Sequence, residues 1–192
     1  MARPQEFDSR EVLVKAMDVF WTKGYEGTSL SDLLHATGLS KSSLYASFGD
    51  KRQLFISAFD TYRHARGQEM NIIMGKGNGR VAVMSFFTKI IDDARDQKLS
   101  RGCMSINQCI ELAPHDLEVR QKVTQDFAEI EAGLEKAIRR GQQDRSISSS
   151  KPSTKLARLL VLGFPSLQIM ARAGLDSSHL HDTLHILLSV LD

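Results

Sequence analysis

Apolar residues recur at intervals of three and four along the whole chain, which is the spacing of one face of an α-helix. No window shows the strict alternation of apolar and polar residues that is typical of a half-buried strand. The spacing therefore predicts an all-α protein. Helices are expected at about residues 8–24, 28–38, 41–48, 50–74, 81–97, 103–113, 117–140, 154–173 and 179–191.

Composition places the chain among ordinary globular proteins. Of its 192 residues 42% are hydrophobic and 25% are charged, and a formal net charge of +2 neither requires nor excludes a nucleic-acid partner. Two cysteines cannot build a disulfide framework, and the first residues lack the apolar segment of an export signal, so a cytoplasmic protein is expected. The uncharged stretch between Arg158 and Arg172 is too short for a membrane anchor, so no membrane partner is expected.

The aromatic residues are concentrated near the N-terminus. Nine of the thirteen Phe, Trp and Tyr residues lie at or before Tyr62. This distribution indicates a small module with a bulky core joined to a larger, more aliphatic one. We expect an N-terminal domain over residues 1–50 and a larger helical domain over residues 51–192.

Two short helices around Gly38 have the pattern of a helix-turn-helix. The first of these helices starts at Thr28 or Ser29, with Asp32 placed to complete a capping box, and Gly38 supplies the positive φ at its end. The second short helix has only Leu44 and Phe48 at the spacing of a buried stripe, so most of its small polar residues are expected outside. Such a helix can project into the major groove of DNA.

The run TSLSDLLHATGLSKSSLYASFGDKRQLF, from Thr28 to Phe55, and the preceding FWTKGYEGT resemble the TetR family of transcriptional repressors. The resemblance covers roughly the first 60 residues, and the rest agrees only in length and helical character. It implies a helix-turn-helix domain followed by a helical regulatory and dimerisation domain, with a homodimer that is released from a palindromic operator by a small-molecule effector. Leu34 and Thr37 depart from the alanines that are frequent there, which affects the helix crossing, and Ala46 and Ser47 are smaller than the residues that often precede the phenylalanine. The family's base preference is therefore not transferred to this chain.

The predicted DNA contacts divide by chemistry. Tyr45 and Lys51 flank the exposed helix with a phenolic donor and a cation suited to phosphate, and Thr28 lies at a helix N-terminus. Lys41 is the long donor on the outer face. The full set of predicted DNA-binding residues is Thr28, Ser40, Lys41, Ser42, Ser43, Tyr45, Ser47 and Lys51. Without an arginine on that face, DNA shape and half-site spacing are expected to contribute much of the specificity.

The larger domain is expected to hold the dimer contact and a ligand cavity. The leucine-rich helices at 154–173 and 179–191 are the predicted dimer interface. The predicted ligand-binding residues are Phe86, Phe87, Cys103, Met104 and Phe127. The sequence does not identify the effector.

Four other hypotheses come from the sequence. Cys103 follows a glycine at a predicted helix start, where unpaired N–H groups favour a thiolate, so a repressor that senses oxidants or electrophiles is the alternative to a reversible ligand. A cysteine enzyme using Cys103 or Cys109 with His115 lacks an identified orienting group, and an adaptor without DNA affinity is the third hypothesis. HDTLH, which contains His181 and His185, resembles a zinc motif but lacks a third ligand. No metal, cofactor or enzymatic activity is expected.

Overall fold

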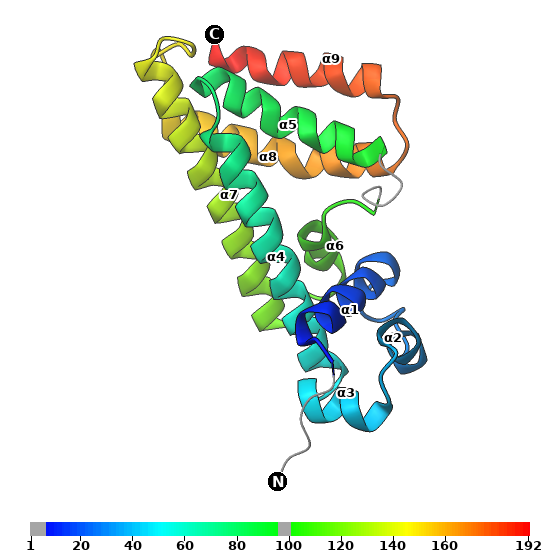
Figure 1. Cartoon of the computed structure of the whole chain (residues 1–192). Coiled ribbons are helices and arrows are strands. Elements are labelled where there is room, and N and C mark those ends of the chain that lie inside the picture. Colours follow the sequence, from blue (N-terminus) through cyan, green and yellow to red (C-terminus); the bar gives the residue numbers. More distant parts are fainter. Residues whose placement is uncertain (1–6, 96–100) are drawn as a thin grey trace.

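The computed structural model describes residues 7–95 and 101–192, and all of the regular elements in those ranges are helical, which confirms the predicted fold class (Figure 1). Their bounds are α1 Ser9–Lys23, α2 Leu30–Thr37, α3 Lys41–Phe48, α4 Lys51–Gly75, α5 Gly79–Arg95, α6 Met104–Glu111, α7 Leu117–Gln143, α8 Ser153–Arg172, α9 Ser177–Leu188 and a 3₁₀ turn Ser189–Leu191. Within the described ranges, none of these helices has the length and apolar character needed to cross a membrane.

Side-chain caps set where the first helices begin. The carboxylate of Asp8 accepts the N–H of Arg10 in the first turn of α1, and that of Asp50 accepts the N–H of Gln53 in the first turn of α4. At α2, Ser29 accepts the N–H of Asp32 at 3.1 Å while the Asp32 carboxylate accepts the N–H of Ser29 at 2.9 Å. This reciprocal pair confirms the predicted capping box.

The contact between α5 and α7 departs from the sequence prediction. We expected α7 to end at Gly141, but the helix continues to Gln143, and α5 begins at Gly79 rather than at 81. A Cβ added to Gly79 would lie 2.2 Å from the backbone nitrogen of Gly141. Gly79 therefore allows α5 to approach the backbone of α7 closely at Gly141. The predicted end of this α5 segment at residue 97 lies outside the described residues.

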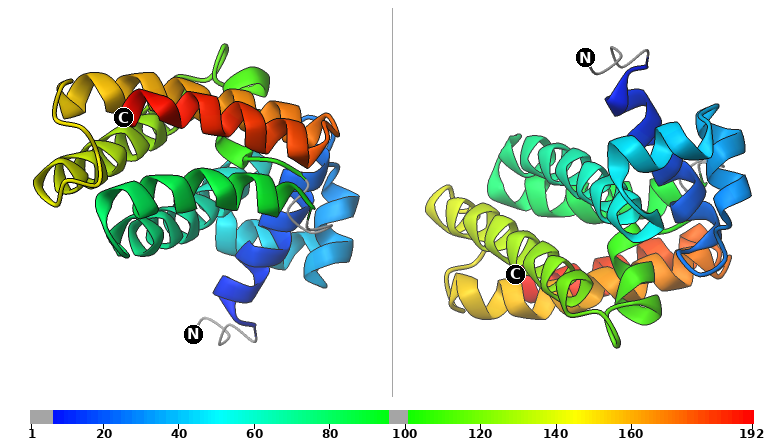
Figure 2. Two further views of the ribbon diagram at one scale, coloured as in Figure 1. Left: turned by 90° about the horizontal axis from the view of Figure 1, so that it is seen from above. Right: turned by 90° about the horizontal axis from the view of Figure 1, so that it is seen from below.

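Two clusters of buried residues make up the interior. One contains the buried side chains of α1, α2 and α3, the first half of α4 and the start of α7, and the other is built mainly from α5, the rest of α7, α8 and α9. α4 and α7 lie side by side and run from the first cluster to the second (Figures 1 and 2). These two long helices are the main physical link between the ends of the molecule.

Candidate DNA-binding interface and internal pocket

α2 and α3 form the predicted helix-turn-helix. Gly38 ends α2 in the left-handed conformation, at φ 73° and ψ 9°, and its N–H donates to the carbonyl of Leu34 at 2.9 Å. Leu33 of α2 and Leu44 of α3 are both fully buried against α1 and α4 in the first cluster. These contacts fix the angle at which α3 leaves the body of the molecule.

The outer face of α3 is polar and lies at the end of the molecule remote from α9 (Figure 1). The Ser40 hydroxyl caps the helix by accepting the N–H of Ser43 at 3.1 Å. Four of the predicted contacts in and beside α3 are exposed: Ser40, Lys41, Ser42 and Ser47. The other two, Ser43 and Tyr45, are half-buried. The structure therefore brings six of the eight predicted DNA-binding residues onto one short helix and its cap.

Thr28 and Lys51 lie beside this helix in different environments. Thr28 is only 1% exposed, and its hydroxyl donates to the carbonyl of Gly24 at 2.6 Å, so the side chain holds the α1–α2 loop. Lys51 opens α4 with its ammonium 4.4 Å from the ring centre of Tyr25, a cation–π distance. Burial, followed by the charge of Glu26, raises the pKa of the Tyr25 phenol, which keeps it neutral under the cation.

A pocket of about 80 Å³ lies among α4, α5, the start of α6, α7 and α8. Phe86, Cys103 and Phe127 from the predicted ligand set are among its lining residues. Phe87 and Met104 are not: both are fully buried, Phe87 in the second cluster and Met104 in the first. The structure thus brings three of the five predicted ligand-binding residues to one cavity.

Sequence reasoning missed the polar residues of this pocket. Arg63, Arg66 and Lys89 line it on the helices α4 and α5, and Gln168 lines it on α8. Gln168 is one turn beyond the buried Phe164 on the same helix face, and a polar residue on such a face was the available signal. The cations gave no signal because charged residues are common on exposed helix faces.

Cys103 sits at the junction of the pocket and α6. It is the N-cap residue of α6, and its sulfur accepts a hydrogen bond from the Tyr62 hydroxyl at 3.4 Å. The same hydroxyl accepts the N–H of Met104 at 3.1 Å. Burial, followed by the neighbouring Cys103, raises the pKa of Tyr62 well above its ordinary value, so the phenol remains a donor to the sulfur.

The segment before α6 also contacts the helix-turn-helix domain. The indole N–H of Trp21 donates to the carbonyl of Gly102 at 2.9 Å, and the Trp21 ring centre lies 4.8 Å from that of Tyr62. The guanidinium of Arg101 lies 4.1 Å from the Trp21 ring centre and pairs with Asp18 at 3.0 Å. Arg101 therefore ties this segment to α1.

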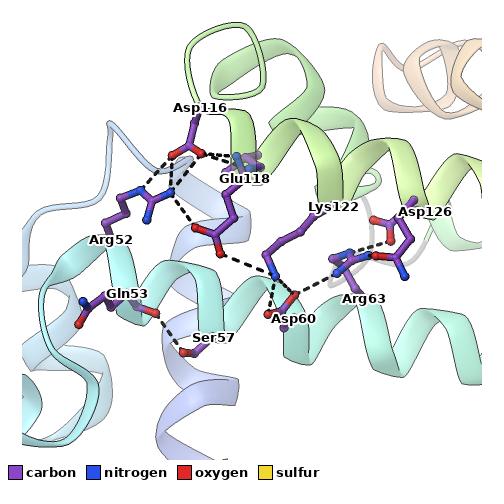
Figure 3. A network of polar contacts seen from close by, with 11 residues as sticks. Arg52, Gln53, Ser57, Asp60, Arg63, Asp116, Glu118, Lys122 and Asp126 are labelled. Carbon is purple, nitrogen blue, oxygen red and sulfur yellow. Dashed lines mark hydrogen bonds and ion pairs between the residues drawn. The ribbon is translucent and has the colours of Figure 1, made fainter.

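A row of ion pairs joins α4 to α7 between the pocket and α3 (Figure 3). Arg52 pairs with the N-cap Asp116 at 2.9 Å, and Lys122 pairs with Asp60 at 2.8 Å. At the pocket end Arg63 pairs with Asp126 at 2.7 Å. Burial raises the pKa of Asp126, against the opposing hydrogen bonds from Ser105 and Arg63.

The histidines of the HDTLH motif are both exposed on α9. Over residues 7–95 and 101–192, no group of three or more His, Cys, Asp or Glu side chains is placed to hold a metal ion.

Two family descriptions match consecutive parts of the chain. Residues 12–58 match "Bacterial regulatory proteins, tetR family", and residues 79–187 match "Tetracyclin repressor-like, C-terminal domain". The chain belongs to the TetR family. The first match contains the complete helix-turn-helix, and the second contains α5 to α8 and most of α9.

Proteins with similar sequences or structures match all or most of the chain. The uncharacterized HTH-type transcriptional regulator YezE of Bacillus subtilis (strain 168) is 33% identical over 194 residues, covering 100% of both chains. The HTH-type transcriptional repressor ComR of Escherichia coli (strain K12) is 32% identical over 90% of this chain and 83% of its own length. Among solved structures, a cysteine mutant of the TetR family transcriptional regulator CifR complexed with 26bp double-strand operator DNA has a TM-score of 0.87, at 26% identity and 100% coverage of both chains.

Proposed function

We propose that this TetR-family protein is a transcriptional repressor that binds a palindromic operator as a homodimer and is released by a small-molecule effector. The observation that carries the proposal is α3, a capped helix with a lysine and serines on its outer face and no other element covering that face in the described ranges. ComR is named a repressor and CifR is solved on operator DNA, which supports this reading. In this proposal, residues 1–50 form the DNA-binding domain and residues 51–192 form the regulatory and dimerisation domain.

The proposed dimer contact uses α8 and α9. Leu162 is 71% exposed on α8, and Ile186 is 70% exposed on α9. Ile169, seven residues after Leu162, is also exposed, so α8 presents an apolar stripe at two-turn spacing. Contiguous exposed apolar side chains mark association surfaces. Pairing there would place two copies of α3 for successive major grooves, about 34–36 Å apart.

The proposed effector acts through the pocket. An effector shifts DNA affinity only if it binds the DNA-bound and free shapes differently. Tyr62 touches the pocket, the start of α6 and Trp21 of α1, while the α4–α7 ion pairs extend from Arg63 to Arg52 beside α3. Movement of α4 against α7 would therefore change the position of α3.

A thiol switch is a second candidate, favoured by the placement of Cys103 in the pocket with the Tyr62 hydroxyl donating to its sulfur. An electrophile such as N-ethylmaleimide would then release the wild-type protein from its operator and leave Cys103→Ser bound. Equal behaviour of the two proteins would exclude this candidate. Cys109 is exposed and provides the matched control variant, Cys109→Ser.

We propose no enzymatic activity. His115 is exposed after α6 and, within the described ranges, makes no hydrogen bond to either cysteine. Catalysis by a cysteine nucleophile needs a base within hydrogen-bond reach.

Fluorescence anisotropy with DNA from the region upstream of the coding sequence tests the main proposal. The wild-type protein should bind with an affinity that falls steeply with salt. Lys41→Ala should reduce the preference for that DNA over a scrambled duplex, because this side chain lies on the outer face of α3. Lys136→Ala, which removes an equally exposed lysine of α7, is the control and should leave the preference unchanged. Equal affinity for both duplexes in the wild type would overturn the proposal.

A further inference from the structure

Gln168 places a carboxamide without a partner among the described residues at the wall of the pocket. It is 8% exposed on α8 and lines the pocket, and none of the residues that the structure describes forms a hydrogen bond with its carboxamide. Among the described residues, the buried side-chain oxygen and nitrogen atoms without a partner are Gln108 Oε1 and Arg140 Nε, so the unpaired carboxamide atoms of Gln168 remain accessible from the pocket. A carboxamide has both an N–H donor and a C=O acceptor to offer. The carboxamide of Gln168 is therefore available to a molecule inside the pocket.

The wall around this amide is apolar and aromatic. The rings of Phe86 and Phe127 lie 5.8 Å and 6.3 Å from that of Phe164, centre to centre, and all three line the pocket. Such faces and edges favour a flat, unsaturated molecule. A volume of about 80 Å³ limits the buried part of a ligand to roughly one ring.

The three cations of the pocket lining are all paired with carboxylates. Arg66 pairs with Glu69 at 2.6 Å and with Asp93 at 2.9 Å. Lys89 pairs with the same two carboxylates, and the third cation of the lining, Arg63, pairs with Asp126. An anionic ligand would have to break one of these ion pairs to find a cation, and a cationic ligand would have to displace a cation from its carboxylate. Glu129, the remaining charged residue of the lining, is exposed and pairs with no cation among the described residues. The enclosed part of the pocket is therefore suited to an uncharged ligand.

We propose that the pocket binds a compact, uncharged, unsaturated molecule whose carbonyl or hydroxyl group pairs with the carboxamide of Gln168. This inference rests on the effector pocket of the proposed function and names the chemical class of its ligand. Because the carboxamide offers both an N–H donor and a C=O acceptor, it can recognise either group.

Four probes of similar size separate these requirements. NMR titrations of the full-length protein would use acetophenone, ethylbenzene, benzoate and benzylamine. Acetophenone should bind tightest, and ethylbenzene, which lacks the carbonyl, should bind roughly threefold to tenfold more weakly for the loss of one hydrogen bond. Both ionic probes should bind more weakly than acetophenone, because the cations of the pocket are already paired and its unpaired carboxylate, Glu129, is exposed to solvent.

Variants at the amide assign the preference to Gln168. Gln168→Leu should abolish the preference for acetophenone over ethylbenzene, and Gln168→Met provides the same test with a longer side chain if the leucine variant does not fold. Gln121→Leu, at an exposed position of α7 outside the pocket lining, is the matched control and should keep the preference. The proposal is overturned if an ionic probe binds tightest, if no probe binds, or if the preference survives in both Gln168 variants.

Operator binding, measured on the same samples, separates this inference from the proposed function. Loss of all specific DNA binding with the acetophenone preference intact would refute the repressor and leave the ligand class standing. Specific, salt-dependent DNA binding without any probe preference would refute the ligand class alone.

Discussion

Replacing Tyr62 with phenylalanine isolates the hydrogen bonds that join the pocket to α6. Met104 is the first residue of α6, so the helix provides no partner for its N–H, and the Tyr62 hydroxyl accepts that N–H at 3.1 Å in a fully buried site. Leaving a buried donor unsatisfied costs about 1–3 kcal/mol. At about 2 kcal/mol, the Tm of a chain of this size should fall by roughly 4–8 °C.

Thermal melts of wild-type and Tyr62→Phe protein at one fixed concentration measure this cost, since association changes the apparent Tm. Tyr45→Phe is the matched control, because the Tyr45 side chain is half-buried on α3 and no described residue pairs with its hydroxyl. Its stability should stay within about 0.5 kcal/mol of the wild type. Equal Tm values for the two variants would refute the reasoning.

Three further changes test other parts of the structure. Lys51→Ala should weaken binding to all DNA sequences and reduce the slope of log affinity against log salt by about 0.9, as expected for one lost phosphate contact. Gly79→Ala should destabilise the protein by about 1–3 kcal/mol in urea melts, because the added Cβ meets the backbone of α7, whereas Gly75→Ala, with nothing within 4 Å, should not. Ser40→Ala should cost about 1 kcal/mol through loss of the α3 cap, and Ser42→Ala, on the same helix, should cost much less.

The helix-turn-helix was predictable because its signals are local. The capping box of Ser29 and the left-handed Gly38 depend only on residues within a few positions along the chain, and both were found where predicted. The end of α7 was not predictable in this way. From the sequence alone, Gly141 is expected to end the helix. Its contact with Gly79, more than sixty positions earlier, is seen only in the structure.

The residues that line the pocket were also only partly predictable from the sequence. Phe86 and Phe87 are adjacent, so they point about 100° apart around α5, and the sequence does not say which of them faces a cavity. Phe86 lines the pocket and Phe87 fills the core. Gln168 was missed because its role depends on side chains from three other helices. Sites assembled from distant helices need the packed structure, whereas a site on one short helix does not.

Hydroxyl-radical footprinting of the full-length protein on its upstream DNA tests the central claim that paired copies of α3 read an operator. The account predicts two protected stretches related by two-fold symmetry, with centres about 10–10.5 bp apart, and a reduced sequence preference in Lys41→Ala. Uniform protection without a preferred site, or no protection at low salt, would contradict it.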